Sequence, residues 1–145
     1  HSKCTVLQYS SSFSLCTISS IRKYLGLKDL NKYNLAIEAY NIEKSINNSA
    51  MGVQDQVASS FGGLNYISFY KKKILVKKIK LNRDELSYIE NNLFLVYTDT
   101  KRSASNILKR HNKIIGLNNK KIKFLRKMHD EVHNTYYNLK RGNIE

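Results

Sequence analysis

The 145-residue sequence predicts an α+β fold, and the spacing of its apolar residues is the main reason. Several stretches repeat apolar residues every three or four positions, as a helix facing a core does. Two short stretches, 64–69 and 74–79, instead have the composition of strands joined by a lysine-bearing turn. The predicted order is helix, helix, helix, strand, strand, helix, strand, helix, helix, which favours α+β over a regular alternation of strands and helices.

The first two predicted helices span residues 10–25 and 30–46. A run of serines can cap the start of the first helix, and Gly26 is expected to end it. In the second helix Glu38 and Glu43 are five positions apart and therefore project in different directions. The apolar face predicted for this helix consists of Leu35, Ala39, Ile42 and Ile46.

Turn residues divide the rest of the chain. A short helix is predicted within 51–61, ahead of Gly62 and Gly63, because glycine adopts backbone angles that other residues avoid. Asn82 and Glu85 have capping-box spacing and predict a helix to about residue 91. A buried strand is expected at 93–98. From residue 101 onward two amphipathic patterns, parted at 116–119, predict helices.

The composition is strongly basic, with a formal charge of +14. Such an excess favours contact with nucleic acid or acidic partners, so a small basic nucleic-acid-binding or interaction module is the alternative function. The excess is mostly lysine, however, and it accompanies abundant Asn, Ile and Tyr without proline, which is typical of an AT-rich genome. We therefore expect no nucleic acid as partner.

The cellular setting is predicted from what the sequence does not contain. No signal-peptide pattern opens it and no run of about 20 apolar residues could cross a bilayer, so we expect a cytoplasmic protein without a membrane partner. Cys4 and Cys16 form no CxxC pair and are expected to be reduced thiols.

The most informative stretch is 51–69, in which Asp55 lies between Gln54 and Gln56. Both amides can hydrogen-bond a polyhydroxylated ligand or orient Asp55 toward one. Asp55 is therefore the predicted chemical centre. The alternative is an acid placed at a helix start because the helix dipole favours it there.

Four blocks occur in order along the chain: SSSF at 10–13, LAIEAYNIE at 35–43, GVQDQVASSFGGLNYISF at 52–69 and LFLVYTDTKRSASNIL at 93–108. In this order they resemble the GHMP sugar kinases, in the branch that acts on heptose 7-phosphate. The resemblance implies phosphoryl transfer from ATP to the anomeric hydroxyl of a heptose 7-phosphate or similar sugar phosphate, with Mg²⁺. Positioning and charge neutralisation dominate such chemistry, which suits a site built from carboxylates.

The resemblance also implies roles for individual residues. Asp55 resembles the catalytic aspartate, and Glu43 with Ser10 resembles the metal-binding pair. The serines 10–12 (Ser10, Ser11 and Ser12) would meet ATP at a helix start, where backbone N–H groups attract phosphate. The residues implied for the substrate are Gln54, Gly62, Gly63 and Arg102.

Each of these residues also has a simpler structural explanation. The serines can be plain helix caps, Glu43 a solvated carboxylate and Arg102 a surface charge. His129 and His133 lie one helical turn apart, but without a third ligand we expect no zinc there. The neighbouring Tyr136 and Tyr137 are interpreted as core packing rather than as a base-stacking platform.

The resemblance implies a fold in which the end of a ribosomal-protein-S5-like N-terminal domain, 1–89, joins the start of a ferredoxin-like C-terminal domain, 90–145, truncated at both ends. Residues 6–9 (Val6 to Tyr9) stand where the family has a glycine-rich ATP loop. We therefore expect a fragment or degenerate copy with little activity alone. Its expected partners are a second copy or a separately encoded N-terminal piece.

Overall fold

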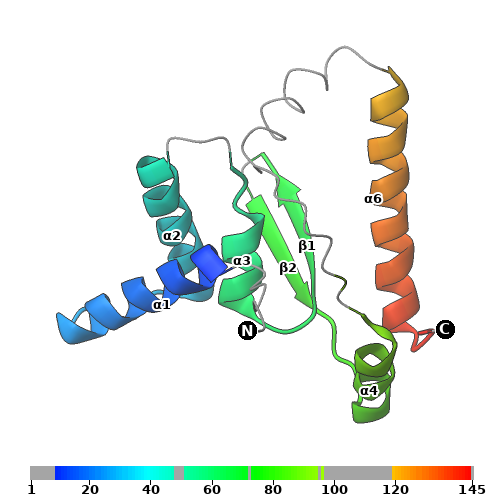
Figure 1. The fold of residues 1–145 in the computed structure, drawn as a ribbon, viewed down its shortest axis with the longest axis horizontal. Coiled ribbons are helices and arrows are strands. Elements are labelled where there is room, and N and C mark those ends of the chain that lie inside the picture. The colour runs from blue at the N-terminus through cyan, green and yellow to red at the C-terminus, as the bar shows by residue number, and fades with distance from the viewer. Residues whose placement is uncertain (1–8, 48–50, 72, 95, 97–118, 145) are drawn as a thin grey trace. The chain divides into compact units, whose positions relative to one another are not determined.

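The computed structural model describes residues 9–47, 51–71, 73–94, 96 and 119–144 (Figure 1). These residues form an α+β arrangement of helices and one two-stranded sheet. The described residues up to Gly63 form one compact unit, and those from Leu64 onward form another. The predicted boundary near Ile89 refers to domains of the family, and it stays a prediction, as do the S5-like and ferredoxin-like folds.

The first unit is built on helix α1, Tyr9–Tyr24. The helix ends as predicted at Gly26, whose φ of +67° only glycine adopts readily. The N–H of Leu27 donates to the carbonyl of Arg22 at 2.9 Å, and that of Gly26 donates to Lys23 at 3.2 Å. These two bonds form a Schellman motif, which satisfies carbonyls that the helix end leaves open.

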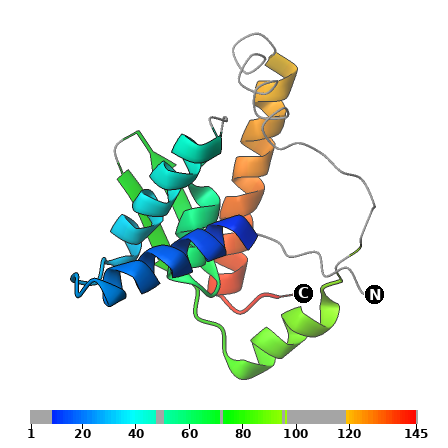
Figure 2. The same ribbon diagram turned by 60° about the vertical axis from the view of Figure 1, so that its left-hand side comes forward.

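Helix α2, Lys32–Asn47, and helix α3, Gln54–Phe61, pack with α1 (Figures 1 and 2). Asn31 caps α2, because its Oδ1 accepts the N–H of Asn34 at 2.8 Å. The buried apolar side chains of this unit are Leu15, Ile18, Ala36, Ala39 and Val57. The alanines leave room for the helices to approach closely, so the core is small but closed.

The predicted apolar face of α2 is partly wrong. Ala39 is buried and Leu35 packs against the core, but Ile42 is 40% exposed and Ile46 is 74% exposed. Buried positions instead follow Ala36, Ala39 and Glu43, a stripe of helical spacing that runs beside the predicted one. An acid therefore occupies the core position that hydrophobicity alone would have given to an isoleucine.

The second unit begins with an antiparallel hairpin of β1, Asn65–Tyr70, and β2, Lys73–Lys78. The predicted strands are confirmed within one residue at each end. Ile67 pairs with Val76, and the N–H of Ile79 donates to the carbonyl of Leu64 at 2.9 Å beyond the hairpin's open end. The chain reaches β1 through Gly62 and Gly63, with φ of +64° and +72°.

Helix α4, Arg83–Asn92, begins at the predicted capping box. Asn82 Oδ1 accepts the Glu85 N–H at 2.8 Å, and Glu85 Oε2 accepts the Asn82 N–H at 2.7 Å. The buried strand predicted at 93–98 is wrong at its described positions, because Leu93, Phe94 and Val96 lie outside any strand and are 71%, 86% and 76% exposed. Apolar composition does not bury a segment that lacks a covering neighbour.

The last described helix is α6, Asn119–Lys140, which confirms the last predicted amphipathic helix. The preceding predicted helix, which begins at residue 101 and stops before the break at 116–119, lies outside the described residues. The prediction of core packing is wrong for Tyr137, which is 53% exposed, while Tyr136 is half-buried against Tyr66. Within the ranges that the structure describes, no helix is both long and apolar enough to cross a membrane.

Candidate functional site

Glu43 is the residue around which the candidate site is built. It follows Ala36 and Ala39 on the core-facing stripe of α2, and only 6% of its surface is exposed. The alternative of a solvated carboxylate is therefore wrong. Glu38, on the other side of the helix, instead lies 3.7 Å from Arg22 in a half-exposed ion pair. An ionised carboxylate is costly to bury, so Glu43 requires polar partners.

The polar partner of Glu43 is Gln56 on α3. Its Nε2 donates to Glu43 Oε2 at 3.1 Å, and only 1% of the Gln56 surface is exposed. The donor must be the amide nitrogen, because an ionised carboxylate only accepts hydrogen bonds. A hydrogen bond to a charged group is stronger than one between neutral groups. This bond joins α2 to α3 inside the core.

The remaining oxygen of each side chain has no hydrogen-bond partner in the described structure. Both Glu43 Oε1 and Gln56 Oε1 are buried and unpaired. Buried polar atoms almost always have a partner, so an unpaired pair of acceptors calls for a donor or a cation. Carboxylate and amide oxygens are suitable ligands for Mg²⁺. The donor set around Glu43 therefore fits a hard divalent cation.

Nothing in the described ranges gathers three side chains of the His, Cys, Asp or Glu type into a cluster that could hold a metal. A closed protein cage is therefore not present there. Mg²⁺ commonly keeps several waters and uses one or two carboxylates together with substrate phosphates. A single buried carboxylate is compatible with that mode of binding.

Asp55 lies beside this pair, in the first turn of α3. Its side chain is exposed to solvent. Gln54 is also exposed, whereas Gln56 is buried. The sequence interpretation gave both amides to a ligand or to Asp55, but the structure turns Gln56 toward Glu43. The glutamines that flank Asp55 therefore have different environments.

The serines 10–12 lie in the first turn of α1, as predicted. Ser11 is buried at 2% exposure, while Ser10 and Ser12 are exposed. Their backbone N–H groups are among those that a helix start leaves without an internal partner, which suits phosphate oxygens. No hydrogen bond links Ser10 to Glu43 within the described part of the chain. The pairing of Ser10 with Glu43 at a metal ion therefore stays a prediction.

The other predicted substrate residues are distributed differently. Gly62 and Gly63 follow α3 directly and are exposed at the turn toward β1. Arg102 lies outside the described residues. At this end of α3, Lys32 Nζ donates to the carbonyl of Phe61 at 3.0 Å, and Ser60 Oγ donates to the carbonyl of Lys32 at 2.6 Å. These bonds fix the end of α3 to the start of α2.

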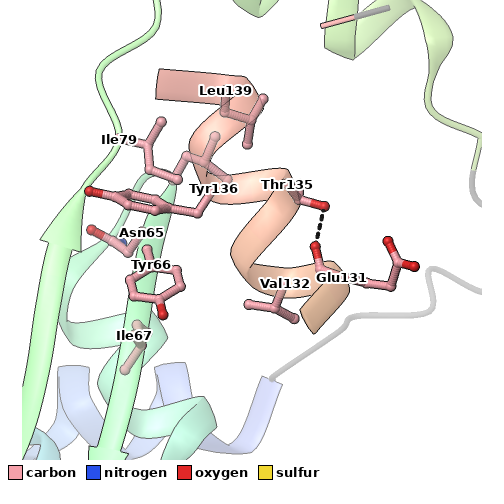
Figure 3. A pocket seen from close by; sticks show the side chains of 10 residues that line it. Asn65, Tyr66, Ile67, Ile79, Glu131, Val132, Thr135, Tyr136 and Leu139 are labelled. Atoms are coloured by element: carbon pink, nitrogen blue, oxygen red, sulfur yellow. Dashed lines mark hydrogen bonds between the residues drawn. The ribbon is translucent and has the colours of Figure 1, made fainter. Parts of the chain in front are cut away.

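A groove of about 440 Å³ lies within the second unit, between β1 and α6 (Figure 3). Tyr66 and Tyr136 meet there with ring centroids 4.3 Å apart, and the Tyr66 hydroxyl lies 3.1 Å from Nε2 of His133. The predicted histidine pair, His129 and His133, stacks with centroids 4.3 Å apart. The groove is lined mostly by apolar side chains, so it differs chemically from the carboxylate site.

Comparison with known proteins relates the chain to a sugar kinase. It is 32% identical over 99 residues to D-glycero-alpha-D-manno-heptose 7-phosphate kinase of Campylobacter jejuni. The match covers 68% of this chain but only 29% of that kinase. No model of a protein family and no solved structure matches the chain.

The residue that sequence reasoning missed is Gln56 as a partner of Glu43. Only its place beside Asp55 pointed to it. The missing information was the direction of each side chain: a helix turns by about 100° per residue, so when Asp55 faces solvent its neighbour can face the core. The alanines of α2 were a further signal, because small residues on a helix face indicate that another helix approaches closely.

Proposed function

We propose that the chain is a sugar kinase of the GHMP type, which transfers a phosphoryl group from ATP to the anomeric hydroxyl of a heptose 7-phosphate or similar sugar phosphate. The observation that carries the proposal is the buried Glu43 with an unpaired oxygen, one hydrogen bond away from the helix that presents Asp55. The similarity to a heptose 7-phosphate kinase supports the class of substrate.

In this proposal each residue does a separate task. Glu43, helped by Ser10, holds Mg²⁺, which when bound neutralises charge on the phosphates. The first turn of α1 directs its N–H groups, with serines 10–12, at phosphate oxygens. Exposed Asp55 accepts the proton of the attacking sugar hydroxyl as a general base. Gln54, Gly62, Gly63 and Arg102 are assigned to the sugar phosphate.

We also propose that the chain turns over slowly alone. Residues 6–9 are Val, Leu, Gln and Tyr where the kinase resemblance implies glycines, and side chains in such a loop would obstruct the close approach of backbone to phosphate. A second copy of the chain is the proposed partner. The cytoplasm is the proposed location, since ATP and sugar phosphates are available there.

The test measures ligand protection and product together on the 145-residue chain. Heptose 7-phosphate with Mg²⁺ and ATP should raise the thermal unfolding midpoint, and mass spectrometry should detect a slow gain of one phosphoryl group. Asp55→Asn should remove the product and keep the protection, whereas Asp29→Asn, an exposed aspartate between α1 and α2, should change neither.

The outcomes separate the parts of the proposal. Absence of protection by these ligands, or product that Asp55→Asn leaves unchanged, would contradict the kinase assignment. Fast turnover that Asp55→Asn abolishes would support the kinase and overturn the low activity.

The alternative function is a basic binding module, which the charge of +14 favours. Exposed lysines surround the hairpin at Lys71, Lys73, Lys77 and Lys78. A nucleic-acid binder of this kind should lose affinity steeply as salt rises, because each neutralised phosphate releases counterions. We expect instead weak binding of single- and double-stranded DNA in fluorescence anisotropy at physiological salt. Tight binding with a steep salt slope would favour the alternative.

A further inference from the structure

We infer that Gln56 is a positioning residue that holds the Glu43 carboxylate with Oε1 directed to a divalent cation. The inference rests on the proposed function, because it concerns the same metal site. Gln56 Nε2 donates a hydrogen bond to Glu43 Oε2 at 3.1 Å, whereas Glu43 Oε1 has no hydrogen-bond partner in the described structure. The two oxygens of this carboxylate thus differ: Oε2 accepts a hydrogen bond from the protein, whereas Oε1 is buried and has no described partner.

The hydrogen-bonding properties of the Gln56 amide and the burial of both side chains determine which Glu43 oxygen is bonded. Rotation of the Gln56 amide by 180° would place its oxygen against Glu43 Oε2, two acceptors facing each other without a proton between them. Both side chains are almost completely buried, at 6% and 1% exposure, so water does not offer a substitute partner. Close packing also limits the rotamers that each side chain can adopt. The pair therefore holds one arrangement.

The bond also links the metal-facing acid to the helix of the proposed base. Gln56 is the residue directly after Asp55, so the contact that orients Glu43 is made by the first turn of α3. The other end of α3 is fixed to α2 through Lys32, which contacts Phe61 and Ser60. With both ends of α3 attached, a shift of Gln56 would displace Asp55 and Glu43 relative to each other.

A simpler role for Gln56 is stabilisation of the core, with no influence on a ligand. Removal of the amide would then lower the stability of the chain but leave cation affinity unchanged. A positioning role predicts a change in cation affinity as well, because partners that orient a metal ligand are typically worth roughly 10–100-fold in affinity. Cation affinity in a chain that remains folded therefore separates the two roles.

The experiment measures Mn²⁺ binding to the 145-residue chain by electron paramagnetic resonance, which detects the free ion. Gln56→Met keeps length and removes the amide, and we expect affinity to fall roughly 10–100-fold. Glu43→Gln should abolish binding at the same site. Asn41→Met and Glu38→Gln make the matched changes at more exposed positions of α2, and they should bind Mn²⁺ like the unmodified chain.

Each outcome has a defined meaning. If the unmodified chain does not bind Mn²⁺, or Glu43→Gln binds equally well, the metal site of the proposed function is wrong and the inference falls with it. If Glu43→Gln loses binding while folded Gln56→Met keeps it, the metal site stands and the positioning role of Gln56 is wrong. Circular dichroism establishes that each variant is folded.

A second measurement covers the case in which Gln56→Met does not fold. Mg²⁺ is titrated into the unmodified, ¹⁵N-labelled chain, and the side-chain amide resonances of Gln56 and Asn41 are followed by nuclear magnetic resonance. We expect the Gln56 resonances to shift with the midpoint of Mg²⁺ binding and those of Asn41 to stay. Mg²⁺ binding that depends on Glu43 but leaves the Gln56 amide unshifted would overturn the inference.

Discussion

The two compact units differ in where their side chains lie. In the first unit, α1, α2 and α3 enclose apolar residues together with three polar ones, Ser11, Glu43 and Gln56. In the second unit none of the described side chains is buried. Both units contain helices with apolar faces, so composition does not explain the difference. What differs is whether neighbouring helices cover each other.

This difference determines where a precise site can form. A carboxylate holds one orientation when packing and hydrogen bonds restrict it, as they do for Glu43 in the first unit. In the second unit large apolar side chains such as Phe94 and Met128 are 86% and 65% exposed. The order of that unit depends on hairpin pairing, a helix cap and contacts at the groove. The candidate catalytic residues that are described all lie in the first unit.

A buried charge gives the largest expected effect. Val57 is fully buried on α3, so Val57→Asp places an unpaired carboxylate in the core and should lower the free energy of unfolding of the first unit by at least about 3 kcal/mol. Val96→Asp makes the same change at a position that is 76% exposed, and it should cost less than about 0.5 kcal/mol. Hydrogen exchange, resolved by peptide, measures both. Equal losses of unfolding free energy from the two substitutions would contradict the conclusion that only the first unit has a buried core.

An enlarged core residue gives the next largest effect. Ala39 is completely buried beside Leu15 and Ile18, so Ala39→Leu should destabilise the first unit by about 2 kcal/mol, because the added carbons have no space. Asn41→Leu adds the same side chain at an exposed position of α2 and should have little effect. Urea unfolding followed by circular dichroism measures the difference. A stable Ala39→Leu variant would show that the helices are less closely packed than described.

Local signals in the sequence predicted much of this arrangement. The cap at Asn82, the stop at Gly26 and the hairpin follow from hydrogen bonds and backbone angles between near neighbours, and the structure has them. The buried strand at 93–98 and the burial of Ile42 depended on which surfaces meet. The strand was wrong at its described positions, and the burial of Ile42 was wrong. Periodicity shows that a face is apolar but not which neighbour covers it.

The candidate site also has parts that the sequence could predict and parts that it could not. Asp55 and Glu43 were selected from the sequence, and the structure places one in solvent and the other in the core. Their catalytic and metal-binding roles stay predictions. The contact between Glu43 and Gln56 could not be predicted, because it depends on how α2 and α3 approach each other.

Loss of a helix cap gives a moderate effect in the second unit. Asn82→Ala removes the side-chain acceptor of the Glu85 N–H and should destabilise α4 by about 1 kcal/mol. Because α4 has no buried residue, the change should speed exchange of its own amides and leave the first unit unchanged. Asn91→Ala, inside the same helix, should not speed exchange. Faster exchange in α1 or α3 would show that the units are coupled in stability.

Removal of one hydroxyl gives the smallest effect and tests what orders the groove. The Tyr66 hydroxyl lies 3.1 Å from His133 Nε2, while its ring lies 4.3 Å from the ring of Tyr136. Tyr66→Phe removes the hydroxyl contact and keeps the rings, so it should cost about 0.5 kcal/mol, the low end for a hydrogen bond that water can partly replace. Tyr70→Phe, at a residue that is 61% exposed, is the control and should cost nothing measurable in urea unfolding. A loss from Tyr66→Phe as large as that from Ala39→Leu would mean that this single contact orders the second unit as strongly as a closed core orders the first.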